Sequence, residues 1–145
     1  MLKKSILLIT SLLALSFIAC SSTSIQKEEI NKPNATLENT YWKAISFYDT
    51  DVKTVAKEAH IKFNEKGSIN GNLGCNNFFG TYKIENDTIS FSKVGSTRMM
   101  CQDMSTEDSF SKVFQDAKKY EIKGETLNFF DDKNINISTF KAVYF

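Results

Sequence analysis

Residues 70–82 read NGNLGCNNFFGTY and hold three of the chain's 6 glycines, four asparagines, one cysteine and two adjacent phenylalanines. Small or apolar residues occupy every second position from Ile69 to Cys75, and the alternation resumes with the opposite parity from Phe78. A change of parity across Gly-Cys-Asn-Asn is typical of a tight turn or a bulge, in which Asn and Gly tolerate a left-handed backbone. The stretch lacks the Lys-Ser/Thr ending of a phosphate-binding loop. We therefore predict a chain reversal between two strands.

Short strands are predicted through most of the remaining chain, with one change of period. Further strands are expected at 40–48, 58–64 and 88–94, and three more between 119 and 145. In residues 105–120 the apolar spacing becomes i, i+3, i+4 and i+7, as in an amphipathic helix. Its apolar stripe consists of Phe110, Val113, Phe114 and Ala117.

The ends of this helix also carry signals. Ser105 is the expected N-cap, and Glu107 and Asp108 complement the positive end of the helix dipole. Lys118 and Lys119 are expected to do the same at the other end. The predicted fold class is α+β. We expect a mainly antiparallel curved sheet or partly open barrel, with one covering helix.

The N-terminal residues carry an export signal. Lys3 and Lys4 precede an apolar stretch from Ile6 to Ala19 that is too short for a comfortable membrane span. The sequence FIAC, which ends at Cys20, resembles the lipobox of bacterial lipoproteins. In these proteins the peptide is cut before the cysteine, which then carries the lipid. An ordinary secretory signal cut nearby and an uncleaved anchor are the alternatives.

The domain organisation follows from this signal. We expect a lipoprotein signal peptide at 1–19, a lipidated flexible tether at 20–36 and one folded domain at 37–145. The expected location is the cell envelope, with the membrane bound through the lipid on Cys20. Ser21 and Ser22 give no acidic retention signal, which favours the periplasmic side of the outer membrane if the organism is Gram-negative.

Charge excludes one class of partner. The whole chain has 18 Lys+Arg against 17 Asp+Glu, and removal of the two leader lysines leaves 16 against 17, a net charge of −1. Without a dense basic face, the chain is not expected to bind nucleic acid.

The cysteine count predicts a covalent link. With Cys20 assigned to the lipid, Cys75 and Cys101 remain as an even pair in an exported protein, which predicts a disulfide. Closing a loop of this length stabilises a domain by roughly 3.5 kcal/mol in the chain-entropy model. The alternative is two reduced cysteines, either buried or reactive.

No pattern of catalytic residues is found. The chain has a single histidine, His60, on the polar face of its strand, and no metalloprotease, hydrolase or phosphate-loop spacing. Met99, Met100 and Met104 lie close to Cys101, and soft ligands of this kind suit Cu(I). Methionines beside a disulfide are more often flexible core filler. We therefore expect no catalytic residue, no cofactor and no metal site.

Four segments together resemble the META domain of HslJ-like heat-shock proteins from bacterial envelopes. They are LENTYW, GSINGNLGCNNFFGTYKI, STRMMC and YEIKGETLNFF, with a glutamate-containing helix start before the last. Arg98 inside the third segment is a departure from the pattern. The resemblance implies that the signature residues build the fold: Gly71, Gly74, Cys75, Asn76, Phe78, Gly80, Tyr82, Ser96, Thr97, Met99 and Cys101.

The functional expectation rests on this resemblance. The family is associated with heat and antibiotic stress and brings no catalytic residues. We expect a lipid-anchored, non-enzymatic envelope protein with a stress-response role. One alternative is a cracked-barrel module that binds a lipid or a peptide in a cavity lined by phenylalanine. Another is an inhibitor or chaperone-like partner of an envelope protein, recognisable by an exposed apolar patch or an unpaired strand edge.

Overall fold

The computed structural model describes residues 34–53 and 56–145. The predicted signal peptide, the lipid-modified Cys20 and most of the predicted tether lie outside the described residues. Within the described part, no helix is both long and apolar enough to cross a membrane.

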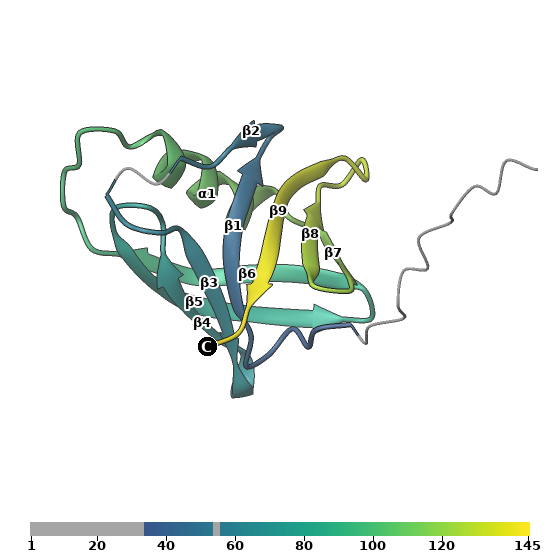
Figure 1. Cartoon of the computed structure of the whole chain (residues 1–145). Coiled ribbons are helices and arrows are strands. Elements are labelled where there is room, and N and C mark those ends of the chain that lie inside the picture. Colours follow the sequence, from purple (N-terminus) through teal and green to yellow (C-terminus); the bar gives the residue numbers. More distant parts are fainter. Residues whose placement is uncertain (1–33, 54–55) are drawn as a thin grey trace, which may run out of the picture. The chain divides into compact units, whose positions relative to one another are not determined.

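The described residues form nine strands and one α-helix (Figure 1). In chain order the elements are β1 (Tyr41–Phe47), β2 (Thr50–Asp51), β3 (His60–Asn64), β4 (Ser68–Asn72), β5 (Asn77–Glu85), β6 (Thr88–Ser96), α1 (Ser105–Asp116), β7 (Lys119–Lys123), β8 (Thr126–Phe130) and β9 (Asn136–Val143). A short 3-10 turn, Glu65–Gly67, joins β3 to β4. The two-residue strand β2 was not predicted from the sequence, whereas the other strands and the helix were.

The strands pair antiparallel in the order β2-β1-β3-β4-β5-β6-β7-β8-β9, and β1 also pairs with β9. This last pairing closes the sheet into a ring. The ring is weakest between β6 and β7, where Thr88 and Lys119 are the single registered pair. The predicted α+β class and the partly open barrel are therefore confirmed.

Turn residues make these reversals possible. Asn86 has a φ of 57° in the two-residue connection between β5 and β6. The pairing of these two strands shifts register between Phe79 and Thr81. Opposite this shift, Lys93 has a φ of 53°, which places a bulge in β6.

Aromatic side chains fill the inside of the ring. Trp42, Phe63, Phe129 and Phe140 are fully buried, and α1 adds Phe110 from its apolar stripe. The ring of Phe110 lies 4.8 Å from that of Phe47 and 5.4 Å from that of Phe140, between centroids. Such rings bury large areas and contribute additional edge-to-face contacts. The buried phenylalanines contact one another, so the core offers no support for an interior ligand cavity.

The helix ends differ from the prediction. Ser105 is the first helical residue, and Met104 occupies the N-cap position without a side-chain cap hydrogen bond. The Ser105 N–H instead donates to Oδ1 of Asp103 at 2.8 Å, and this bond lowers the pKa of the Asp103 carboxyl. The helix ends at Asp116 because Ala117 has an extended backbone. Of the two predicted C-terminal cations, Lys118 donates to the Gln115 carbonyl and Lys119 belongs to β7.

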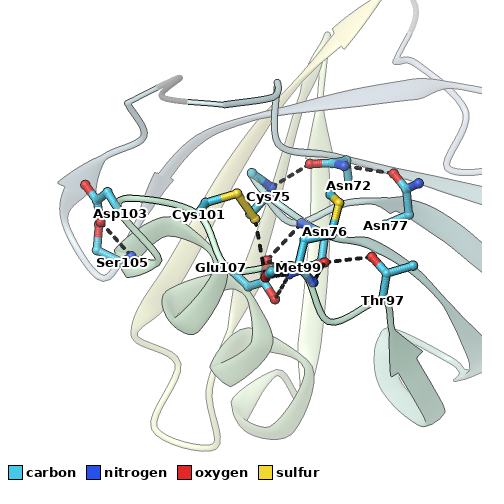
Figure 2. The surroundings of a disulfide bond; sticks show 11 residues. Asn72, Cys75, Asn76, Asn77, Thr97, Met99, Cys101, Asp103, Ser105 and Glu107 are labelled. Atoms are coloured by element: carbon cyan, nitrogen blue, oxygen red, sulfur yellow. Dashed lines mark hydrogen bonds between the residues drawn. A yellow bond between two sulfur atoms is a disulfide. The ribbon is translucent and has the colours of Figure 1, made fainter.

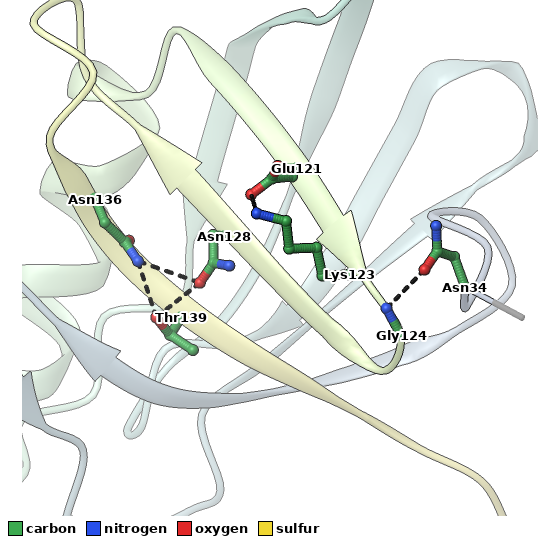
Figure 3. A network of polar contacts seen from close by, with 7 residues as sticks. All are labelled: Asn34, Glu121, Lys123, Gly124, Asn128, Asn136 and Thr139. Atoms are coloured by element: carbon green, nitrogen blue, oxygen red, sulfur yellow. Dashed lines mark hydrogen bonds and ion pairs between the residues drawn. The ribbon is translucent and has the colours of Figure 1, made fainter. Parts of the chain in front are cut away.

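The first described residues attach to the turn between β7 and β8 (Figure 3). Gly124 N–H donates to Oδ1 of Asn34 at 2.7 Å, and Ala35 N–H donates to the Gly124 carbonyl at 2.7 Å. Residues 34–36, at the end of the predicted tether, therefore already contact the domain.

Figure 3 also shows a polar network between β8 and β9, made by Asn128, Asn136 and Thr139. This network lies at the surface of the two strands.

Candidate functional site

The predicted reversal lies between β4 and β5, at residues 73–76. Leu73 N–H donates to the Asn76 carbonyl at 2.8 Å and closes the turn. Asn72 braces it from one side, because its Oδ1 accepts from Gly74 N–H and its Nδ2 donates to Oδ1 of Asn77, both at 2.8 Å. Gly74 has a φ of 109°, a conformation that side chains rarely allow. The glycine and asparagines of this stretch therefore serve the chain reversal.

Asn76 lies buried at the centre of a hydrogen-bond network (Figure 2). Its Nδ2 donates to the Met99 carbonyl at 2.9 Å and to both carboxylate oxygens of Glu107 at 3.1 Å. Its Oδ1 accepts from Thr97 Oγ1 and from Met99 N–H, both at 2.7 Å. The amide thus joins the reversal, the segment after β6 and the first turn of α1.

Glu107 is buried, although the sequence interpretation gave it only a role at the helix dipole. Its Oε2 also accepts the backbone N–H of Asn76 at 2.9 Å. A buried carboxylate is costly unless it is hydrogen-bonded, and here Asn76 supplies the donors while the helix N-terminus supplies a favourable dipole. The available signal was its position three residues before Phe110, which places it on the buried face of the helix.

A disulfide joins Cys75 to Cys101 in the structure, with Cα atoms 6.1 Å apart. This separation lies within the usual range for such bonds. Cys75 is next to Asn76 in the chain, so the covalent link and the amide network fasten the same two segments. The residues that tie residues 97–107 to the reversal are together called the clasp: Cys75, Asn76, Thr97, Met99, Cys101 and Glu107.

The chemical capacity of the clasp is limited. The Asn76 amide and the Glu107 carboxylate are taken up by mutual contacts, and the two sulfur atoms are bonded to each other. No activated nucleophile or free base is present among these residues. The clasp therefore positions the segment between β6 and α1.

The other signature residues also build the fold. A Cβ on Gly71 would lie 2.0 Å from the His60 carbonyl oxygen, so β3 and β4 can approach closely only with glycine here. Phe78 belongs to the core. The Tyr82 hydroxyl donates to Glu38, and burial together with this carboxylate raises the pKa of Tyr82. Gly80 faces inward against β6, and Ser96 ends that strand.

The interpretation of the methionines as core filler was wrong for Met99 and Met100, whereas Met104 is half-buried. Met100 is 90% exposed and Met99 49% exposed, because the clasp holds the backbone of this segment and leaves their side chains at the surface. Among the described residues, no group of three or more His, Cys, Asp or Glu could hold a metal ion.

His60 does not belong to the clasp. Its ring stacks on Tyr41 with centroids 4.3 Å apart, and its Nδ1 lies 3.0 Å from the Glu58 carbonyl oxygen. These contacts are those of a packed strand residue.

The described domain matches a known protein family. The family model of the META domain covers residues 35–144, and the META domain family is not a known enzyme family. No curated protein matches the chain.

Solved structures support the architecture. A protein determined by NMR is 23% identical with a TM-score of 0.60, over 74% of this chain and 94% of that one. A second NMR structure, from Burkholderia xenovorans, is 18% identical with a TM-score of 0.60, over 75% of this chain and 85% of that one. A crystal structure of a DUF4847 family protein from Bacteroides vulgatus is 12% identical with a TM-score of 0.54, over 72% of this chain and 93% of that one. At these identities, the similarity shows the fold alone.

Proposed function

Since the chain belongs to the META domain family, we propose that it is a lipid-anchored, non-enzymatic protein of the cell envelope that acts in the response to heat or antibiotic stress. The lipid is carried by Cys20, and residues 21–33 form the link between the lipid and the domain. The location is the outer membrane, on its periplasmic side, if the organism is Gram-negative.

We further propose that the domain acts by binding another envelope protein. The observation that carries this choice is the strand β6, which pairs with β5 along its length but with β7 through one residue pair. An incompletely paired strand offers backbone groups to a partner. The alternative of a ligand held inside the barrel is less favoured, because buried aromatic rings occupy the core.

Membrane attachment is tested by fractionation. Cys20→Ser and globomycin treatment should each move the protein out of the membrane fraction, because both prevent lipid attachment to the cysteine. Ser21→Ala is the matched control and should remain membrane-bound. Retention of the Cys20→Ser variant in membranes would refute the lipoprotein assignment.

The stress role is tested by survival. A strain that lacks the protein should survive heat shift or antibiotic challenge less well than its parent, and wild-type protein should restore survival. Cys20→Ser should restore it poorly, because the protein is no longer held at the membrane. Equal survival of the deletion strain and its parent under both challenges would contradict the stress role.

A further inference from the structure

One side of β6 lacks a neighbouring strand. At Ile89 the backbone N–H still donates to the Lys118 carbonyl, at 2.9 Å. Residues 90–96 of β6 pair with β5 on one side. On the opposite side, no described residue makes a backbone hydrogen bond to them. Backbone groups of alternate strand residues point to the same side, so Phe91 directs its N–H and C=O there. This side of residues 90–96 is called the free edge.

A groove runs between the free edge and helix α1. Its volume is about 350 Å³. Phe91 and Val94 from β6 and Phe114 from α1 give it an apolar floor, while Ser111 and Gln115 give the helix side a polar rim. A strand edge beside a helix can accept an extended peptide, because the edge supplies backbone hydrogen bonds and the groove receives every second side chain.

The outer face of the same edge is also apolar. Phe79 of β5 is 67% exposed, and its ring lies over Gly95, where a Cβ would come within 3.3 Å of it. The missing side chain at Gly95 leaves this ring accessible to a strand next to β6. An added strand would therefore meet apolar surface with both of its faces.

Charge distinguishes the possible occupants. Lys93 is the charged residue among those that line the groove, and it lies in the bulge of β6. A second copy of this chain paired edge to edge in the register centred on Lys93 would bring two such lysines together, which is unfavourable. A partner with a carboxylate at this point would instead gain a favourable contact.

We propose that the free edge and its groove bind an extended peptide segment of another protein, which adds to the sheet as a strand beside β6. The segment places apolar side chains over Phe91 and Val94 and a carboxylate near Lys93. The inference rests on the proposed function, because it specifies how the domain would bind an envelope protein.

The probe is a library of random phage-displayed peptides of about ten residues, a length that covers one strand. Mature lipidated protein in nanodiscs is the target, and empty nanodiscs remove lipid binders. Selected peptides are synthesised, and their affinity is measured by fluorescence anisotropy. We expect enrichment of sequences that alternate β-branched or aromatic residues with polar ones and carry Asp or Glu. Failure to enrich any sequence on the protein would overturn the proposal.

Two matched pairs of variants locate the binding. Val94→Glu places a charge in the groove and should weaken binding about tenfold or more. Ile45→Glu is the control, because Ile45 lies on β1 and its exposed fraction, 39%, matches the 38% of Val94. Lys93→Glu should reverse the preference from acidic to basic peptides, while Lys141→Glu on β9 makes the same change in net charge and should have no effect. The proposal would be overturned if the two variants of either pair lost the same amount of peptide affinity.

Backbone pairing is tested on the peptide, which avoids any effect on folding. Methylation of alternate peptide amides on one edge should abolish binding, and methylation on the other edge should leave it unchanged, because one edge of an added strand faces β6. Strand addition would be contradicted if methylation of neither edge weakened binding, or if methylation of each edge weakened it equally.

Other occupants are separate outcomes that would also overturn the proposal. One is a concentration-dependent dimer that Val94→Glu abolishes in analytical ultracentrifugation. Another is binding of phosphatidylglycerol vesicles that depends on Val94. Failure of the peptide proposal would leave the membrane and survival tests of the proposed function unaffected, so the two can fail independently.

Discussion

Strand β6 leads from the free edge into the clasp, and the two regions differ in how their polar groups are satisfied. In the clasp, a buried amide and a buried carboxylate bond to each other and a disulfide lies beside them. At the free edge, Phe91 has backbone groups without a partner among the described residues. Buried polar groups are costly unless they are paired, whereas exposed ones can bond to water. Substitutions in the clasp should therefore change stability, and substitutions at the free edge should change binding.

The largest effect is expected from removal of the disulfide. The double substitution Cys75→Ser and Cys101→Ser should lower the free energy of unfolding by about 3.5 kcal/mol, because the unfolded chain gains the freedom of an open loop. Urea denaturation measures this, and reduction of the wild-type protein should give a similar loss. Thiol labelling of the denatured, unreduced protein should leave both cysteines unmodified. Full labelling, or no loss of stability, would show that the clasp does not need this bond.

The amide network should have the next largest effect. Asn76→Ala should destabilise the domain by about 2–3 kcal/mol, because it removes the side-chain amide that donates to the buried carboxylate of Glu107 and leaves the backbone N–H of residue 76 as the remaining donor from this position. Asn128→Ala is the control, since its amide belongs to the surface network of Figure 3, and should cost about 0.5 kcal/mol or less.

A double-mutant cycle of Asn76→Ala with Glu107→Gln isolates the contact between these two side chains. It should show a coupling of about 1 kcal/mol or more. Additive effects would mean that the two residues act independently, contrary to the description of the clasp.

A smaller loss of stability is expected where the backbones of β3 and β4 approach closely at Gly71. Gly71→Ala should cost about 1–3 kcal/mol, since the new Cβ would lie 2.0 Å from the His60 carbonyl oxygen and the strands must move apart. Gly95→Ala is the matched change at the free edge, where the nearest atom is in the exposed ring of Phe79 at 3.3 Å. In thermal unfolding, Gly95→Ala should lose less than half as much stability as Gly71→Ala. A reversed order would contradict the close approach of β3 and β4 at Gly71.

The smallest effect on stability is expected at the surface. Met100→Ser should change the free energy of unfolding by less than about 0.5 kcal/mol, because this side chain is 90% exposed. Chemical denaturation provides the comparison with the clasp variants. A loss of several kcal/mol would mean that residues 97–104 pack more tightly than their exposure indicates.

Local patterns predicted much of the fold. The parity change after Cys75 located the reversal, and the spacing from Phe110 to Ala117 located the helix. Counting the cysteines predicted the pair that is bonded in the structure. Each of these features depends on short-range periodicity or on composition, which a single sequence displays directly.

Features that depend on distant contacts were not predicted. Asn76, the partner of Glu107, lies 31 positions away. The contact at the helix start is local, but there Asp103 rather than Ser105 provides the side chain. The exposure of Met100 follows from the way the clasp holds the backbone beside it. The single residue pair between β6 and β7 depends on the path of the chain through α1. The helical spacing places Glu107 on the buried face, but no local pattern in the sequence names the partners in these contacts.

Native-state hydrogen exchange of backbone amides, read by NMR, tests the difference between the two regions most directly. The N–H groups of Asn76 and Met99 are donated to buried acceptors and should exchange only through global unfolding. The N–H of Phe91, at the free edge, should exchange orders of magnitude faster in the same sample. Strong protection of Phe91 in the free protein, or fast local exchange at Asn76 and Met99, would contradict the account.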